Sequence, residues 1–251
     1  MQSRRIYPVQ RMLNSLHRLL FSYLAGTALL VADTAPSVDA HTQDLRLTVA
    51  VTALQSSATS EGETRRIRAE LEALVVEAPA AEPGIAARYL LGRLRQIEEG
   101  IGKPPEFTAL ISEYPQHPLA QLAAVKVILR RLYADGPETP EARLQAAEQL
   151  GRVVTLPALL CDFHQAMGDA YIFYGDRREP ALRHLRAAEA LGIPSAAARA
   201  NVLVQIGELA RLTGEAAVAE WSYRKFLADF PRDLRQQIVR DRLAEMGGAA
   251  P

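Results

Sequence analysis

Apolar residues recur along most of this chain at the three- and four-residue spacing of amphipathic helices. The clearest stripe, over residues 118–134, consists of Leu122, Val125, Ile128, Leu129 and Leu132. An Asp-Gly-Pro turn signal follows, and Thr139 before Pro140 suits a helix cap and a first helical residue. A second helix is then expected over residues 141–154. The pattern predicts two helices joined by a short turn.

The same spacing predicts helices at both ends of the chain. Residues 43–57 and 63–77 form a weaker pair across a small polar run, and residues 233–246 form a final helix rich in charged side chains. A polar terminal helix is what an array of stacked hairpins needs to close its last apolar face. Strand signals are scarce, because the β-branched clusters are short and lie within or at the ends of helical patterns. An all-α fold is therefore expected.

One set of small, aromatic and proline positions occurs more than once. Residues 200–233 carry it most completely, with Gly207, Gly214, Ala219, Tyr223 and Pro231 at its fixed positions. Residues 223–233 align with residues 107–117, where an aromatic residue and a proline again end the segment. Proline suits this closing step because it cannot continue a helix. A third copy starts near Cys161, with one residue inserted before Ala181.

On these positions the chain resembles the tetratricopeptide repeat (TPR) family, whose unit is a helix–turn–helix of about 34 residues. The resemblance covers residues 200–233, 161–194 and 85–117 most closely. It implies a right-handed helical solenoid of about five TPR-like hairpins with a C-terminal capping helix, formed by residues 41–251 as one domain. A generic irregular helical bundle is the alternative, since alanine-rich helices with glycine at turns occur in many all-α proteins.

Residues 1–40 have the features of a secretory signal peptide. A long basic region holds Arg4, Arg5, Arg11 and Arg18, and a 14-residue apolar segment follows at residues 19–32. Residues 38–40 then offer a cleavage step. An apolar segment of this length is short for a membrane span, which needs about 20 residues. We therefore expect export to the periplasm or cell envelope, with an uncleaved inner-membrane anchor or a folded first helix as alternatives.

The net charge and the lack of common catalytic motifs argue against two classes of function, nucleic-acid binding and catalysis. The chain has no formal net charge, and residues 41–251 hold 25 basic and 27 acidic side chains, which argues against binding a nucleic-acid backbone. No HExxH, CxxC or GxSxG motif occurs. Cys161 and His164 could bring a thiol beside an imidazole, but no third group to orient them is evident. We predict a protein that is not an enzyme, with no cofactor and no metal site.

The TPR resemblance implies a concave ligand groove lined by the first helix of each hairpin. Carried over by repeat position, the groove residues are Tyr89, Arg93, Lys126, Arg130, Tyr133, Asp162, Gln165, Asp169, Phe173, Asn201, Val204, Glu208 and Arg211. Three basic members, Arg93, Lys126 and Arg130, come from the N-terminal half, and the acidic members, Asp162, Asp169 and Glu208, come from the C-terminal half. Such a groove would orient a bound segment, with its acidic part against the basic end.

The sequence therefore predicts an exported bacterial TPR scaffold that binds a protein or peptide partner in the cell envelope. Two alternatives are a structural protein that self-associates into a homo-oligomer through an end of the solenoid, and a membrane-anchored adaptor. A third is an enzyme or regulator in which the helical array orders a substrate glycan or lipid, for which the groove offers few aromatic residues.

Overall fold

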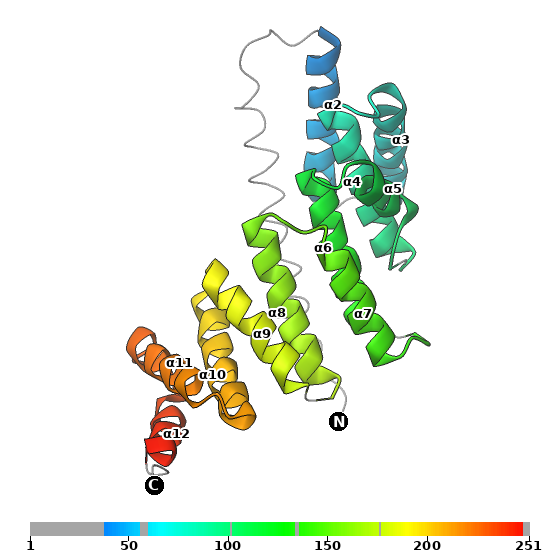
Figure 1. Cartoon of the computed structure of the whole chain (residues 1–251). Coiled ribbons are helices and arrows are strands. Elements are labelled where there is room, and N and C mark those ends of the chain that lie inside the picture. The colour runs from blue at the N-terminus through cyan, green and yellow to red at the C-terminus, as the bar shows by residue number, and fades with distance from the viewer. Residues whose placement is uncertain (1–37, 56–59, 101, 134–135, 176, 248–251) are drawn as a thin grey trace. The chain divides into compact units, whose positions relative to one another are not determined.

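The computed structural model describes residues 38–247 except 56–59, 101, 134–135 and 176 (Figure 1). The helices of this part are α2 (Val38–Gln55), α3 (Glu61–Glu77), α4 (Glu82–Glu98), α5 (Pro105–Glu113), α6 (Pro118–Tyr133), α7 (Pro140–Gly151), α8 (Pro157–Phe173), α9 (Arg178–Leu191), α10 (Ala196–Thr213), α11 (Ala216–Asp229) and α12 (Gln236–Gly247). No strand occurs within these ranges, so the predicted all-α class is confirmed. The predicted signal peptide lies outside them except for its last residues, which begin α2.

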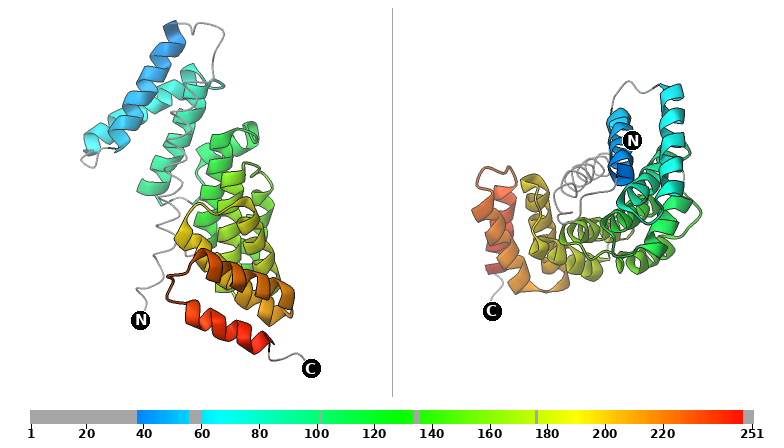
Figure 2. Two further views of the ribbon diagram at one scale, coloured as in Figure 1. Left: turned by 90° about the vertical axis from the view of Figure 1, so that its left-hand side faces the viewer. Right: turned by 90° about the horizontal axis from the view of Figure 1, so that it is seen from above.

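The chain forms two compact units, one ending at Arg130 and the other beginning at Arg131, so the boundary falls within α6. In the first unit, α3 packs with α2 and α4, and α4 packs with α5. In the second, α8 packs with α9, α9 with α10, α10 with α11, and α11 with α12 (Figure 2). This consecutive pairing is the packing of a TPR-like helical solenoid, as predicted. The assignment of residues 41–251 to one domain stays a prediction.

Three hairpins, α4–α5, α8–α9 and α10–α11, have a close approach at one glycine of their first helix. A Cβ atom added at this glycine would lie 2.3–2.5 Å from a side chain of the second helix, far inside van der Waals contact. The pairs are Gly92 with Phe107, Gly168 with Leu185, and Gly207 with Tyr223. The two residues of these pairs are 15, 17 and 16 positions apart, respectively. The residue inserted before Ala181 accounts for the longest spacing, in the pair of Gly168 with Leu185. The recurrence of this contact confirms the repeat alignment that the sequence predicted.

Helix starts follow local capping chemistry more than repeat position. The Thr139 hydroxyl accepts a hydrogen bond from the amide of Ala142 at 3.2 Å, so α7 begins at Pro140 as predicted. Helix α8 begins at Pro157, four residues before the expected start at Cys161, because proline suits a first helical position. Helix α10 also begins early, at Ala196, where Ser195 caps it by accepting from the Ala198 amide.

The C-terminal end of the fold carries exposed apolar side chains. Helix α12 packs on α11 through the buried Val239. Ile238 is 58% exposed, and Leu234, which precedes the helix, is 98% exposed. On α11, Trp221 is about half exposed. The predicted capping helix is therefore present, but its outer surface includes apolar residues among the charged ones.

Candidate binding face

Two first helices of the second unit place predicted groove residues on adjoining surfaces. Asp162, Gln165 and Asp169 are spaced by three and four residues on α8, so they share one side of it. Asn201, Glu208 and Arg211 share one side of α10 in the same way. The amide of Gln205 joins the two sides, donating to Asp169 Oδ1 at 3.2 Å. We call the six predicted residues Asp162, Gln165, Asp169, Asn201, Glu208 and Arg211 the polar face.

Glu208 is the centre of an ionic network on this face. Its carboxylate accepts hydrogen bonds from the Tyr223 hydroxyl at 2.7 Å and from Arg211 Nη2 at 2.9 Å, and Arg242 Nε of α12 lies 3.3 Å away. Burial raises the pKa of Glu208, but the donors from Arg211 and Tyr223 outweigh it and the pKa is lowered. Glu208 therefore stays charged at neutral pH, and its charge is balanced by two arginines.

The segment at the start of α12 is tied to the same face. Arg235 Nη1 donates to the side-chain oxygen of Asn201 at 2.6 Å, and the same guanidinium bonds Asp233 at 2.6 Å. That pairing lowers the pKa of Asp233 to about 2. Three members of the polar face are therefore tied to a neighbouring segment: Asp169 to α10, Asn201 to the residue before α12, and Glu208 to α11 and α12.

On α8, burial raises the pKa of two polar side chains, Asp169 and Cys161. Burial raises the pKa of Asp169, and the hydrogen bond from Gln205 only partly offsets this. The amide of Gln165 approaches the Cys161 sulfur at 3.5 Å, and burial raises the pKa of that thiol to about 11. A thiol that stays protonated at neutral pH is a poor nucleophile. The Cys161 thiol donates to the Ala188 carbonyl at 3.6 Å, and Nδ1 of His164 faces His184 at 2.9 Å.

Two aromatic residues lie beside this surface. The Tyr133 hydroxyl donates to the carbonyl of Ala166 at 3.3 Å, and its ring meets Phe173 edge-on at a centroid distance of 6.4 Å. Burial raises the pKa of Tyr133, so the phenol remains neutral. Phe173 is about half exposed, which makes it the apolar contact that the predicted groove offers in this unit.

The predicted residues of the first unit divide between core and surface. Tyr89 is 2% exposed and stacks on Phe107 at 5.4 Å, and Lys126 is 3% exposed. Arg93 is half-buried and donates to Gln96 at 2.7 Å. Arg130 is exposed and donates to the Gly100 carbonyl at 3.1 Å. Only Arg93 and Arg130 of this set can reach a ligand without a change in packing.

Sequence reasoning missed several residues that build the polar face. Arg235 and Arg242 come from the predicted capping helix, and Gln205 stands one position beyond Val204 on α10. Tyr223 was assigned only to a fixed position of the repeat, but its hydroxyl also donates a hydrogen bond to Glu208. The position of a residue within the repeat predicts which side of its own helix it occupies. It does not predict which long side chains from neighbouring helices will contact that residue.

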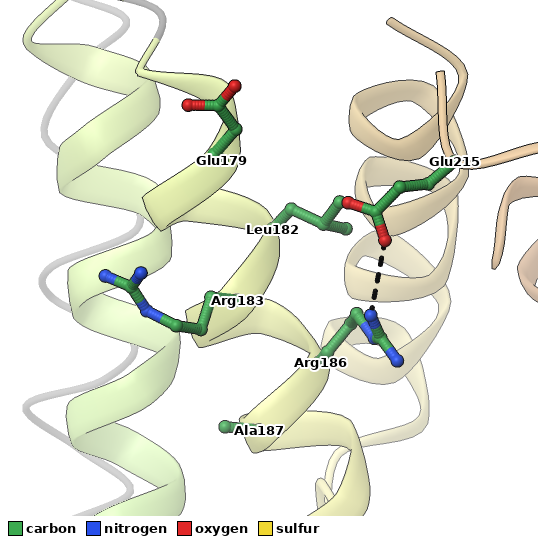
Figure 3. A pocket seen from close by; sticks show the side chains of 6 residues that line it. All are labelled: Glu179, Leu182, Arg183, Arg186, Ala187 and Glu215. Carbon is green, nitrogen blue, oxygen red and sulfur yellow. Dashed lines mark hydrogen bonds and ion pairs between the residues drawn. The ribbon is translucent and has the colours of Figure 1, made fainter. Parts of the chain in front are cut away.

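A shallow pocket of about 360 Å³ lies beside α9 in the second unit (Figure 3). Its lining residues are Glu179, Leu182, Arg183, Arg186, Ala187 and Glu215. Arg186 and Glu215 form an ion pair across it, with Nη1 and Oε2 3.4 Å apart. The part of the chain that the structure describes holds no group of three or more His, Cys, Asp or Glu side chains arranged to bind a metal ion.

Comparisons with known proteins give a fold likeness among solved structures. No family model and no curated protein matches the sequence. Among solved structures, the chain is similar to a thermophilic TPR protein from Thermus thermophilus, with 20% sequence identity and a TM-score of 0.41. The likeness covers 80% of this chain and 99% of that one.

Proposed function

Because the chain has a TPR-like fold of consecutive helical hairpins, we propose that it is a scaffold, without catalytic activity, that binds a protein or peptide partner on the polar face. The observation that carries this proposal is the set of bonds joining α8, α10 and α12, Gln205 to Asp169 and Arg242 to Glu208. A surface whose polar side chains are already fixed loses little conformational entropy when a ligand binds. Function inferred from a fold alone is an analogy, so the face must be tested directly.

Site-specific photo-crosslinking in the native host tests the face. A photoreactive amino acid at Asn201, which is exposed on the polar face, is expected to capture a discrete partner. The same amino acid at Arg224, exposed on α11, is the matched control and is expected to capture none or different species. Equal products from both positions would show that the polar face is not the binding surface. Partner bands from Asn201 are then identified by mass spectrometry.

We further infer a role in the bacterial cell envelope, which rests on the signal-like residues 1–40. No helix in the described part combines the length and apolar character needed to cross a bilayer. Intact mass of the chain recovered from its host is expected to correspond to a start near His41. A mass that includes residues 1–40 would refute cleavage and favour an anchored adaptor.

Self-association is the second candidate function. It is favoured by Trp221, Leu234 and Ile238, apolar side chains exposed on α11 and at α12. Exposed apolar residues at the end of a helical array can meet the same end of a second copy. Light scattering during size-exclusion chromatography separates the two candidates, because the proposed scaffold needs no dimer. A stable dimer that Ile238→Glu dissociates would favour self-association.

A further inference from the structure

A second cavity of the second unit, of about 420 Å³, is lined by residues of α7, α8 and α9 and their ends. Small-molecule sites typically have volumes of about 300–1,000 Å³. The polar lining includes Arg152, His164 and Arg183, and the apolar lining includes Phe163 and Val154. None of its lining residues belongs to the polar face, so this cavity is separate from the surface proposed above.

The two arginines of this cavity differ from most arginines of the same unit. Arg131, Arg177, Arg186, Arg199, Arg211, Arg235 and Arg242 each pair with a carboxylate. No side-chain hydrogen bond or close ion pair of Arg152 or Arg183 occurs among the residues that the structure describes, although the charge of Arg183 helps to lower the pKa of Glu148. Two guanidinium groups with unused donors therefore border one cavity.

A chain of hydrogen bonds fixes the histidines beside them. Glu148 Oε1 accepts from the Tyr171 hydroxyl at 2.8 Å and faces His184 Nε2 at 2.8 Å. The pKa of Glu148 is lowered, mainly by the hydrogen bond with His184, so this carboxylate is charged and only accepts. His184 therefore carries its proton on Nε2, and when neutral its Nδ1 accepts from Nδ1–H of His164 at 2.9 Å. Nε2 of His164 has no partner among the described residues.

We propose that this cavity binds the carboxylate group of a ligand through Arg152, Arg183 and protonated His164. Planar guanidinium groups match a carboxylate by paired hydrogen bonds. The apolar lining suits an organic acid with an apolar body. The two arginines and Glu148 give the lining a net charge of +1, and protonation of His164 adds another positive charge. Inorganic phosphate has no apolar part to contact Phe163 and Val154, so the lining favours an organic carboxylate over phosphate.

The arrangement predicts the direction of a pH dependence. Burial, and then the neighbouring His184, lower the pKa of His164, while Glu148 opposes this shift. Arg152 and Arg183 also line the cavity and oppose the protonation of His164. A bound carboxylate stabilises the protonated imidazole and so raises the pKa of His164. By linkage, affinity for the carboxylate rises as pH falls through the pKa of His164, and a pKa that rises by about one on binding corresponds to about tenfold tighter binding by the protonated form.

Titration of the full chain with 4-phenylbutyrate, followed by imidazole resonances in NMR, tests the proposal. We expect saturable shifts of the His164 signal, a higher His164 pKa in the bound form and tighter binding at acid pH. Arg183→Gln is expected to weaken binding about tenfold or more, the usual effect of losing hydrogen bonds to a charged group. The matched control is Arg186→Gln on the same helix, whose guanidinium faces Glu215 (Figure 3). It is expected to bind 4-phenylbutyrate like the wild type.

A pair of peptides tests whether the carboxylate ligand is a peptide C-terminus or a small organic acid. A short peptide with a free C-terminal carboxylate and an apolar last residue is compared with its C-terminal amide. Binding of the free acid alone identifies a peptide C-terminus as a ligand of the cavity, whereas binding of 4-phenylbutyrate alone identifies a small organic acid. No saturable His164 shift with any carboxylate, equal affinities of Arg183→Gln and Arg186→Gln, or binding of inorganic phosphate in preference to 4-phenylbutyrate overturns the proposal. None of these outcomes bears on the polar face, because crosslinking from Asn201 tests that surface separately.

Discussion

Gly207→Ala is expected to destabilise the chain by about 1–3 kcal/mol, the usual cost of overpacking a buried contact. The added Cβ would lie 2.3 Å from Cε1 of Tyr223. The Tyr223 ring is fully buried, and its hydroxyl is held by Glu208 at 2.7 Å, so the ring cannot turn away without losing that bond. Helices α10 and α11 must separate instead. Gly207→Leu should cost more, because its longer side chain has no space beside the ring.

The matched control is Gly62→Ala in α3, where an added Cβ has no heavy atom within 4 Å. Alanine has a higher helix propensity than glycine, so this change should be neutral or stabilise by up to about 1 kcal/mol. Chemical denaturation of both variants and the wild type measures the difference. If Gly207→Ala is as stable as Gly62→Ala, the helices of this hairpin are not in contact at Gly207 and the repeat register is wrong.

The sequence was sufficient to assign Gly207 and Tyr223 to fixed positions of the repeat, because the repeat spacing is carried by residues that have few substitutes. Only glycine allows the helices to approach at Gly207, and Pro231 ends the unit whatever lies around it. The early start of α10 was missed for a related reason. Ser195 caps the helix through one local hydrogen bond, and the alignment of repeats gave that residue no weight. A local capping residue thus sets where α10 begins, whereas the repeat spacing sets which of its residues pack against α11.

The candidate sites were less predictable because they depend on pairing between distant residues. Repeat position placed Tyr89 in the groove, but Phe107 covers its ring from the next helix. His164 was considered as a partner of Cys161, whereas its observed partner, His184, lies on the other helix of the hairpin. Whether Arg183 is paired depends on which carboxylates come within 4 Å of it, and spacing within one helix cannot show this.

Glu208→Ala is expected to destabilise the chain by about 2–3 kcal/mol and to loosen α12. The change removes the acceptor of the Tyr223 hydroxyl, and an unsatisfied buried hydroxyl costs about 1–3 kcal/mol. It also removes the carboxylate shared by Arg211 and Arg242, partly exposed ion pairs that contribute about 0.2–1 kcal/mol. Because Arg242 belongs to α12, amide hydrogen exchange should accelerate there more than in α8. Glu208→Gln, which keeps an acceptor for Tyr223, should lose less stability.

The control is Glu220→Ala on α11, which removes only an exposed ion pair with Arg224 and should cost less than about 0.5 kcal/mol.

The pH dependence of stability supplies a second readout. The pKa of Glu208 is lowered from its ordinary value of 4.5, so its contribution is present above pH 4.5 and is lost as pH falls through the folded-state pKa. The stability difference between wild type and Glu208→Ala should therefore shrink in acid. A difference no larger than that of Glu220→Ala at neutral pH, with unchanged exchange in α12, would show that Glu208 does not hold the C-terminal helix to the polar face.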